Sequence, residues 1–288
     1  MSWRTVVVRG PAKLDLKLGQ MVVRQEKTTR VNLNEMAVLM IENTAVSLTA
    51  CLLSELTSRK IKVIFCDEKR NPQAELVPYY GSHDSSAKLR AQIAWPPLVR
   101  EQVWSEIVRE KIRNQALVLA WQNLPQAALL QQYLEQLLPG DASNREGHAA
   151  KVYFNALFGP EFTRSRDIPQ NAALNYGYSI LLSAFNREIA AAGYCTQLGL
   201  FHDNMFNPFN LASDLMEPFR PLVDRAVLQM RPEKLETEEK TQLIGLINCE
   251  VNIAGKRQYL LNAIRIYCKS IFDVLNREEN ARIQFYCL

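Results

Sequence analysis

The stretch Gly81-Ser-His-Asp-Ser-Ser86 marks the place where the hydrophobic pattern of the chain changes its period. Before it, apolar and polar residues alternate, most strictly in Lys13-Leu-Asp-Leu-Lys-Leu18, and this spacing is typical of a β-strand. After it, apolar residues recur every three or four positions, as in a helix, beginning with Val99, Val103, Ile107 and Val108. The polar, flexible stretch between the two patterns therefore predicts a domain boundary.

Residues 1–82 are expected to form a small β-rich domain with one helix. The helix is predicted for Val46–Arg59, where leucines at 48, 52, 53 and 56 follow helical spacing. The other apolar or alternating runs are short and predict strands. These predicted strands are Thr5–Arg9, Lys13–Leu18, Met21–Arg24, Thr28–Leu33, Met36–Ile41 and Ile61–Cys66.

Residues 83–288 are expected to form a larger all-α domain, so the predicted fold class is α+β. After the helix that begins near Val99, a second one is stopped by Pro139-Gly140. We find no internal repeat. The further helical candidates are Leu124–Leu138, Gly147–Leu157, Ala172–Ala192, Asp214–Met230, Glu238–Leu246 and Gln258–Leu275.

The composition is that of a folded globular protein, with 48% hydrophobic and 22% charged residues among 288. The net charge of +4 permits a nucleic-acid partner without requiring one, since binding depends on where the charges cluster. The six cysteines form no CxxC pair and predict reduced thiols in a cytoplasmic protein. No apolar run approaches the roughly 18 residues that span a bilayer, and the N-terminal residues show no signal-peptide pattern.

The usual signatures of nucleotide-binding loops, serine hydrolases and HExxH metalloproteases are absent from the sequence. Only three histidines are present: His83 in the linker, His148 and His202. Glu146 has two interpretations. It completes a Ser143-x-x-Glu146 capping box at a helix start, or it projects from the first helical turn as a carboxylate ligand.

His202 lies in a segment rich in asparagine, which places it at the edge of a loop. Asp214, Glu217 and Arg220 follow it at intervals of three along one helical face. This pattern is compatible with a structural histidine beside an exposed Glu217–Arg220 ion pair. It is also compatible with a site in which carboxylates and an imidazole hold Mg²⁺ or Mn²⁺.

Four stretches, taken in order, resemble the CRISPR-associated spacer-acquisition integrases, and the resemblance covers nearly the whole chain. The amino-acid sequence of residues 208–219 is most similar to that of the type II members of the family. The matching stretches are Glu146-Gly-His-Ala-Ala-Lys-Val-Tyr153-Phe, Asn175-Tyr-Gly-Tyr-Ser-Ile-Leu181, Gly199-Leu-Phe-His202 and Asp214-Leu-Met-Glu217-Pro-Phe-Arg-Pro-Leu-Val-Asp224.

The resemblance implies that Glu146, His202 and Glu217 are catalytic metal ligands, with Asp214 as a fourth candidate. The implied reaction is a metal-dependent transesterification, in which a DNA 3′-hydroxyl inserts a spacer into a CRISPR array; water in its place would give endonuclease activity. Two alternatives remain. The chain could be a non-catalytic DNA-binding scaffold of the same fold, or an unrelated helical metal hydrolase of a small phosphorylated substrate.

The resemblance also implies double-stranded DNA, both prespacer and CRISPR repeat, as a partner. We expect a homodimer through the N-terminal domains, because a short β domain has too little core to cover its sheet and an exposed apolar sheet face invites pairing. The resemblance adds a small ferredoxin-like partner protein that bridges two such dimers. Lys256 and Arg257 are expected to open a basic helix on which Arg265 and Lys269 stack. The candidate DNA-binding residues are Arg164, Arg166, Tyr176, Arg220, Lys256 and Arg257.

Overall fold

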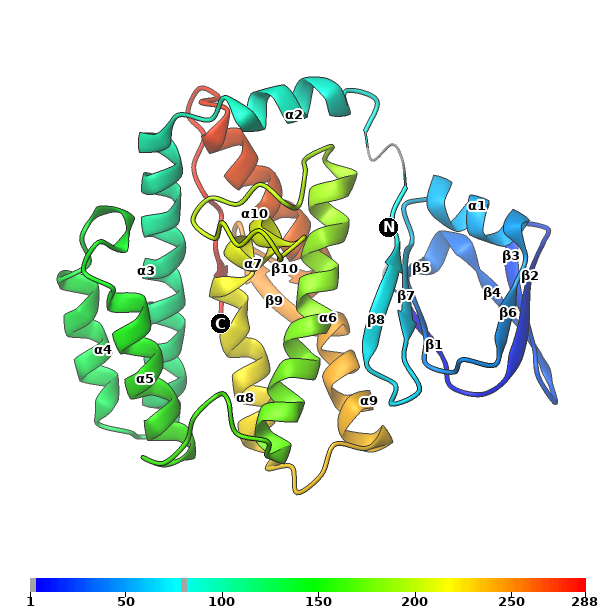
Figure 1. Cartoon of the computed structure of the whole chain (residues 1–288), viewed down its shortest axis with the longest axis horizontal. Helices are drawn as coiled ribbons and strands as arrows, with labels where there is room; N and C mark the ends of the chain where they lie inside the picture. Colours follow the sequence, from blue (N-terminus) through cyan, green and yellow to red (C-terminus); the bar gives the residue numbers. More distant parts are fainter. Residues whose placement is uncertain (1–3, 79–81) are drawn as a thin grey trace. The chain divides into compact units, whose positions relative to one another are not determined.

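The computed structural model describes residues 4–78 and 82–288, in two compact units (Figure 1). The first unit comprises residues 1–85 together with 190–193, and the second comprises residues 86–189 and 194–288. The division between Ser85 and Ser86 falls three residues after the boundary expected from the linker. Gly81, the first residue of that linker, lies outside the described residues.

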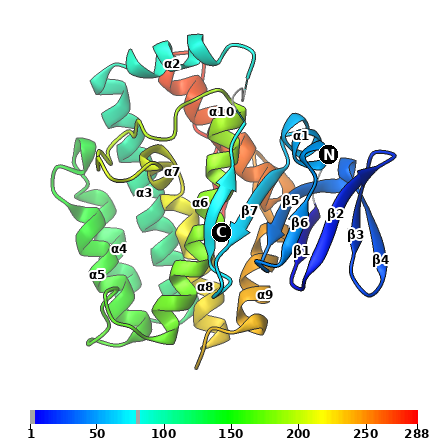
Figure 2. The same cartoon turned by 45° about the vertical axis from the view of Figure 1, so that its right-hand side comes forward.

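The first unit contains two four-stranded sheets, which Figures 1 and 2 show from two directions. One sheet has the order β1-β5-β7-β8; β1, β5 and β7 are parallel, and β8 is antiparallel to β7. The other has the order β4-β3-β2-β6. The strand bounds are β1 Arg4–Val8, β2 Ala12–Lys17, β3 Gln20–Arg24, β4 Thr28–Asn32, β5 Met36–Ile41, β6 Val46–Leu48, β7 Lys62–Cys66 and β8 Pro72–Leu76.

Both sheets and helix α1 (Ala50–Ser58) contribute to one hydrophobic core in this unit. Leu14 of β2, Leu39 of β5 and Leu52 of α1 are fully buried in it. Among the described residues of the unit, the exposed large apolar side chains are Leu18 and Val77. The uncovered apolar sheet face that motivated the expectation of a homodimer is therefore not present in this part of the chain.

One local prediction for the first unit was wrong, and one strand was not predicted. The run Val46–Arg59 is not one helix, because its first three residues form strand β6 and pair with β2. Thr49 ends that strand and caps the helix, its hydroxyl accepting a hydrogen bond from the Leu52 amide at 3.3 Å. Strand β8 was missed, since its sequence Pro-Gln-Ala-Glu-Leu has neither an apolar run nor strict alternation.

The second unit is built around the long helix α3 (Pro97–Trp121), which packs against α4, α5, α8 and α10. Among the described residues, no helix is both long enough and apolar enough to cross a membrane. The other helices of this unit are α2 Ser85–Ile93, α4 Gln126–Glu135, α5 Arg145–Phe158, α6 Pro169–Ala191, α7 Asn210–Leu215, α8 Arg220–Met230, α9 Thr237–Gly245 and α10 Leu260–Leu275, with 3₁₀ turns at Pro139–Asp141, Glu217–Phe219 and Leu246–Asn248.

The second unit is not wholly helical. Strands β9 (Glu250–Ile253) and β10 (Lys256–Tyr259) form a hairpin, and β11 (Tyr286–Cys287) pairs with β9. The hairpin turn is Ala254-Gly255, and both residues have positive φ, as a tight two-residue hairpin requires. Lys256 and Arg257 therefore lie on a strand and do not open a helix, which begins only at Leu260.

Candidate functional site

His202 is held by the buried carboxylate of Asp214 on α7. Its ring Nδ1 lies 2.5 Å from Asp214 Oδ1, and its backbone amide donates to the same oxygen at 3.1 Å. Because a carboxylate only accepts, Nδ1 carries the proton, and Nε2 is the ring atom left to bind a ligand. The hydrogen bond with Asp214 raises the pKa of His202, although burial acts in the opposite direction.

Asp214 organises the whole turn before His202. Its Oδ2 accepts the backbone amides of Leu200 at 2.6 Å and Phe201 at 3.1 Å, and the side chain is completely buried. Both oxygens are thus already engaged by donors from residues 200–202. This arrangement favours a positioning role for Asp214 over direct metal coordination.

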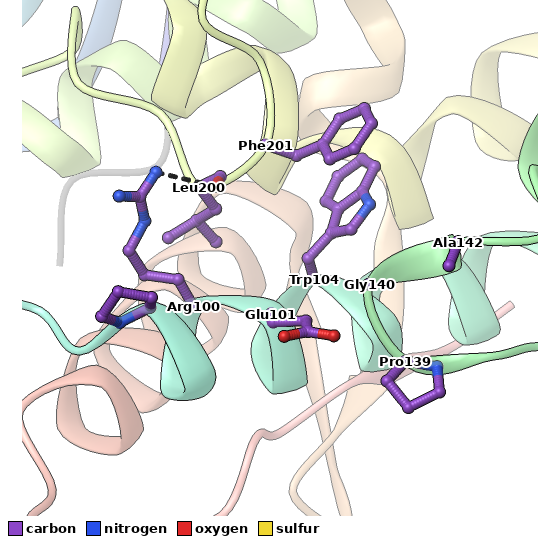
Figure 3. A pocket seen from close by; sticks show the side chains of 9 residues that line it. Arg100, Glu101, Trp104, Pro139, Gly140, Ala142, Leu200 and Phe201 are labelled. Atoms are coloured by element: carbon purple, nitrogen blue, oxygen red, sulfur yellow. Dashed lines mark hydrogen bonds between the residues drawn. The ribbon is translucent and has the colours of Figure 1, made fainter.

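The turn at residues 199–202 is also held by Arg100 of helix α3, and it requires glycine at position 199. Arg100 donates to the carbonyl oxygens of Gly199 at 3.1 Å and Leu200 at 3.0 Å; Figure 3 shows its guanidinium beside this loop. A Cβ at Gly199 would lie 2.3 Å from the His202 carbonyl oxygen and 2.8 Å from Asp214 Oδ2. Only glycine permits this close approach, which explains why residue 199 lacks a side chain.

Glu146 projects from the first turn of α5, and the predicted capping box does not form. Residue 144 is the N-cap in a left-handed conformation, and Ser143 Oγ donates to the Gln136 carbonyl at 3.3 Å. The helix is instead capped by Asp141, whose carboxylate accepts the amides of residues 145 and 146 at 2.7 and 3.0 Å. The Glu146 carboxylate is therefore free to point toward α3.

Glu217 lies in the 3₁₀ turn that follows α7 and is 4% exposed. Its Oε1 accepts from Arg220 Nε at 2.9 Å, and its Oε2 lies 2.5 Å from Lys111 Nζ. Burial alone would raise the pKa of Glu217, but the charges of Arg220 and Lys111 outweigh it and lower that pKa to about 2. Glu217 is therefore ionised at neutral pH.

Lys111 of α3 joins the two glutamates. Its ammonium contacts both Glu146 Oε1 and Glu217 Oε2, and the side chain is 8% exposed. Burial lowers the pKa of Lys111, but the two carboxylates more than compensate and raise it. Lys111 was not predicted from the sequence, although a signal was present: it falls on the apolar face of its helix, four residues after Ile107 and three after Val108.

The structure brings together part of the predicted metal site. Glu146 and Glu217 converge on one cationic group, and His202 lies near enough for the Glu217 charge to raise its pKa. Among the described residues, no three or more His, Cys, Asp or Glu side chains form a metal-ligating group. The donor set nevertheless fits Mg²⁺ or Mn²⁺, because two carboxylates already share a cation beside an imidazole with a free Nε2.

Most of the predicted DNA contacts near this site have other partners. Arg220 pairs with Glu217 and lies 4.6 Å over the Tyr178 ring. Arg164 bonds two asparagine side chains, at 171 and 175, and also lies over Tyr178. Tyr176 is 3% exposed, so its ring is not available to stack on a base. Arg166 is exposed and donates to the Glu161 carbonyl oxygen.

Asp224 on α8 is fully buried and accepts a hydrogen bond from the Tyr178 hydroxyl. Burial raises its pKa to about 6, although the bonding hydroxyls and the charge of Arg220 lower it. Since the unfolded chain loses this proton near pH 4, the folded protein binds the proton more tightly between pH 4 and 6. Asp224 therefore contributes stability below about pH 4 that is lost as pH rises through 6.

Asp224→Asn is expected to remove this contribution, because an amide keeps an acceptor for Tyr178 without a charge. The unfolding free energy of the variant minus that of the wild type should rise by up to about 3 kcal/mol as the pH increases from 4 to 6. Above pH 7 this difference should stay constant. Urea unfolding at pH 4, 5, 6 and 7 measures the difference. A difference that stays constant across this range would contradict a raised pKa at Asp224.

The chain is similar to known proteins over nearly its whole length. Residues 6–263 match the family model described as CRISPR associated protein Cas1. The chain is 36% identical over 271 residues to the CRISPR-associated endonuclease Cas1 of Neisseria meningitidis, covering 92% of this chain and 89% of the relative. It is 26% identical over 287 residues to the CRISPR-associated endonuclease Cas1 1 of Francisella tularensis, covering 90% and 89%.

Solved structures share the fold of this chain. A casposase bound to its integration product superposes with a TM-score of 0.78 at 17% identity, over 97% of this chain and 92% of that one. The shared fold is a β-rich unit followed by a mostly helical unit. The chain belongs to the CRISPR-associated Cas1 family, as the four sequence stretches indicated.

Proposed function

We propose that this protein is a metal-dependent DNA integrase that inserts short foreign DNA into a CRISPR array, as a type II member of its family. The observation that carries the proposal is the convergence of Glu146 and Glu217 on one buried cationic position beside the His202 loop. The two carboxylates come from segments some seventy residues apart in the sequence. Only the tertiary structure brings both carboxylates to the same group, and that group is a cation, the ammonium of Lys111.

The proposed reaction exchanges one phosphodiester for another. A 3′-hydroxyl of the incoming DNA attacks a repeat phosphorus, a new P–O bond forms, and the bond to the repeat 3′-oxygen breaks. Bound Mg²⁺ or Mn²⁺ would lower the cost of forming the attacking oxyanion and would screen the phosphate charge. Glu146, Glu217 and His202 Nε2 would hold the ion, while Asp214 keeps His202 in the required tautomer and orientation.

A second candidate is a non-catalytic DNA-binding scaffold of the same assembly. Lys111 favours it, because an ammonium between the two carboxylates already neutralises them without a metal. Strand transfer from a short DNA duplex to a CRISPR-repeat duplex, with Mg²⁺ or Mn²⁺ against EDTA, decides between the two. Metal-dependent joined product supports the integrase, whereas DNA binding with no product at any metal concentration supports the scaffold.

The partners are proposed with the same function: double-stranded DNA, a second copy of this chain, and a small ferredoxin-like protein bridging two dimers, in a prokaryotic cytoplasm. A fold relative titled as a Cas6-RT-Cas1–Cas2 complex, with a TM-score of 0.74 over 97% of this chain and 36% of that one, supports such an assembly. The homodimer should appear as twice the chain mass in light scattering at micromolar concentration. A monomer at that concentration would contradict it.

Lys256 and Arg257 remain candidates for DNA contact because both are exposed on the β9–β10 hairpin. Arg257 forms a cross-strand ion pair with Glu250 at 2.6 Å, yet its side chain is 75% exposed. Replacing both with alanine should weaken duplex binding and reduce the slope of log affinity against log salt by up to about 2, without changing the melting temperature.

The matched control for this pair is Lys13→Ala with Lys17→Ala, which removes the same charge from exposed positions of strand β2. Binding is measured by fluorescence anisotropy from 50 to 300 mM salt. Equal slopes for the two double variants would show that Lys256 and Arg257 act only through net charge.

A further inference from the structure

A buried glutamine holds the loop that carries His202. Gln92 lies in the last turn of α2 and is 4% exposed; all residues of this helix are described, and Gln92 is the only buried one. Its Nε2 donates to the carbonyl oxygens of Cys195 at 2.8 Å and Leu198 at 3.0 Å, and its Oε1 accepts the Cys195 amide at 2.8 Å. Both N–H donors and the oxygen of the side chain are therefore bonded to the backbone of one loop.

The His202 loop (residues 195–209) is otherwise bonded to itself and to α7. Asn210 and Asp214 of α7 bond its backbone through their side chains. Among the described residues, the hydrogen bonds that reach the loop from outside itself and α7 come from Gln92 and from Arg100 of α3. These two side chains therefore anchor the loop to helices α2 and α3.

The two anchors act on the backbone directly before His202. Gln92 bonds residues 195 and 198, and Arg100 bonds residues 199 and 200, next to which Figure 3 shows its guanidinium. Asp214 fixes the imidazole relative to α7, whereas Arg100 fixes the same turn relative to α3. Helix α3 also carries Lys111, which contacts both candidate carboxylate ligands. The anchors thus relate the imidazole to the place where those carboxylates meet.

The position of Gln92 is itself fixed by the end of α10. Trp95, three residues further on, is 5% exposed, and its Nε1 donates to Asn276 Oδ1 at 3.0 Å. The Asn276 amide donates in turn to the hydroxyl of Tyr194, the residue before the loop, at 2.7 Å. The rings of Trp95 and Tyr194 have centroids 5.5 Å apart. Because Gln92 and the start of the loop are joined to the same residue, Gln92 cannot follow a displaced loop.

We propose that Gln92 and Arg100 are positioning residues of the metal site, which set where the His202 ring stands relative to the carboxylates of Glu146 and Glu217. Each acts through the backbone before His202 and contacts neither the metal nor the DNA. The inference rests on the proposed function, since it concerns the ligand geometry of the same site. A purely structural role would lower stability and leave metal affinity unchanged.

Gln92→Glu separates geometry from charge. The variant keeps the length of the side chain and the acceptor for the Cys195 amide, but it places a carboxylate against the carbonyl oxygens of Cys195 and Leu198. An added negative charge by itself favours a divalent cation, whereas a displaced loop weakens its binding. We expect the affinity of the full-length protein for Mn²⁺, measured by electron paramagnetic resonance without DNA, to fall by about 10-fold or more.

Arg100→Met repeats the test at the second anchor. Arg100 is half-buried, so the variant should fold, and the loss of a positive charge again favours a cation unless the loop moves. We expect a similar fall of about 10-fold. Asn43→Asp is the matched control, because the Asn43 amide also bonds backbone, at Arg9 and Ala45 of the first unit. This control should keep wild-type Mn²⁺ affinity, and thermal melting identifies the variants that are folded.

Nuclear magnetic resonance of the His202 ring gives a second measurement, with the signal assigned among the three histidines by His202→Ala. Mn²⁺ should broaden this signal in the wild type at a concentration that leaves it sharp in Gln92→Glu. Wild-type Mn²⁺ affinity in folded Gln92→Glu and Arg100→Met would overturn the positioning role. A wild type that binds Mn²⁺ beside His202 but transfers no DNA strand would overturn the proposed function and leave the positioning role intact. Absence of Mn²⁺ binding by the wild type would overturn both.

Discussion

His202→Ala is expected to lower the rate of strand transfer by at least about 100-fold, while the fold and most DNA affinity remain. The ring is 42% exposed, so its removal costs little packing. Asp214 keeps the three backbone amides of residues 200–202, which hold the turn in place without the ring. What the variant loses is the ring Nε2 that the proposed metal site requires as its nitrogen ligand.

The matched control is His148→Ala, which removes the same ring from α5, where His148 lies 6.4 Å from the Tyr133 ring. Asp214→Asn gives an intermediate test, because an amide can no longer accept from all four donors and should misorient His202. We expect its rate to fall by about 10- to 100-fold, less than for His202→Ala. Transfer at the wild-type rate by His202→Ala would eliminate His202 as a ligand.

Glu146→Ala is expected to abolish strand transfer with a loss of about 1 kcal/mol of stability or less. The side chain is 30% exposed, and its removal leaves Lys111 paired with Glu217. Relief of repulsion between the two carboxylates does not stabilise the variant, because Lys111 already lies between them.

Lys111→Ala provides the contrast, since it leaves the buried Glu217 without one of its two cations. Removing one partner from a buried pair costs about 3–5 kcal/mol, reduced here because Arg220 remains bonded to Glu217. Glu106→Ala, at an exposed carboxylate of α3, is the surface control. Urea unfolding and the strand-transfer assay are run on all three variants. A Glu146→Ala protein that melts early yet integrates DNA normally would make Glu146 a structural residue.

Periodicity located many elements correctly and failed where local sequence is ambiguous. The apolar repeat places α5 and α6 within three residues of their observed N-terminal bounds. It failed at Val46–Leu48, because three residues cannot show whether a period is two or 3.6, and pairing with β2 decides the outcome. The same holds for the β9–β10 hairpin, whose buried Val251 and Ile253 alternate over too few positions to be distinguished from a helix start.

The sequence motifs predicted Glu146, His202 and Glu217 as candidates, but their partners came from the fold. Spacing suggested that Ser143 caps α5, and the structure assigns that role to Asp141, because residue 144 adopts a left-handed conformation that redirects the chain. Asp214 was a candidate metal ligand because it lies three residues before Glu217 in the sequence. Only the return of residues 199–202 onto α7 shows that its oxygens are already engaged.

The sequence by itself determined the fold class and the family and supplied the candidate residues of the site, because these depend on periodicity and on short motifs read along the chain. The tertiary structure alone decided that Lys111 joins Glu146 to Glu217, and that Trp104 and Phe201 make a flat wall beside His202. Each of these contacts joins residues 35 or more positions apart. No local pattern encodes such a distance, since helix packing around α3 sets it.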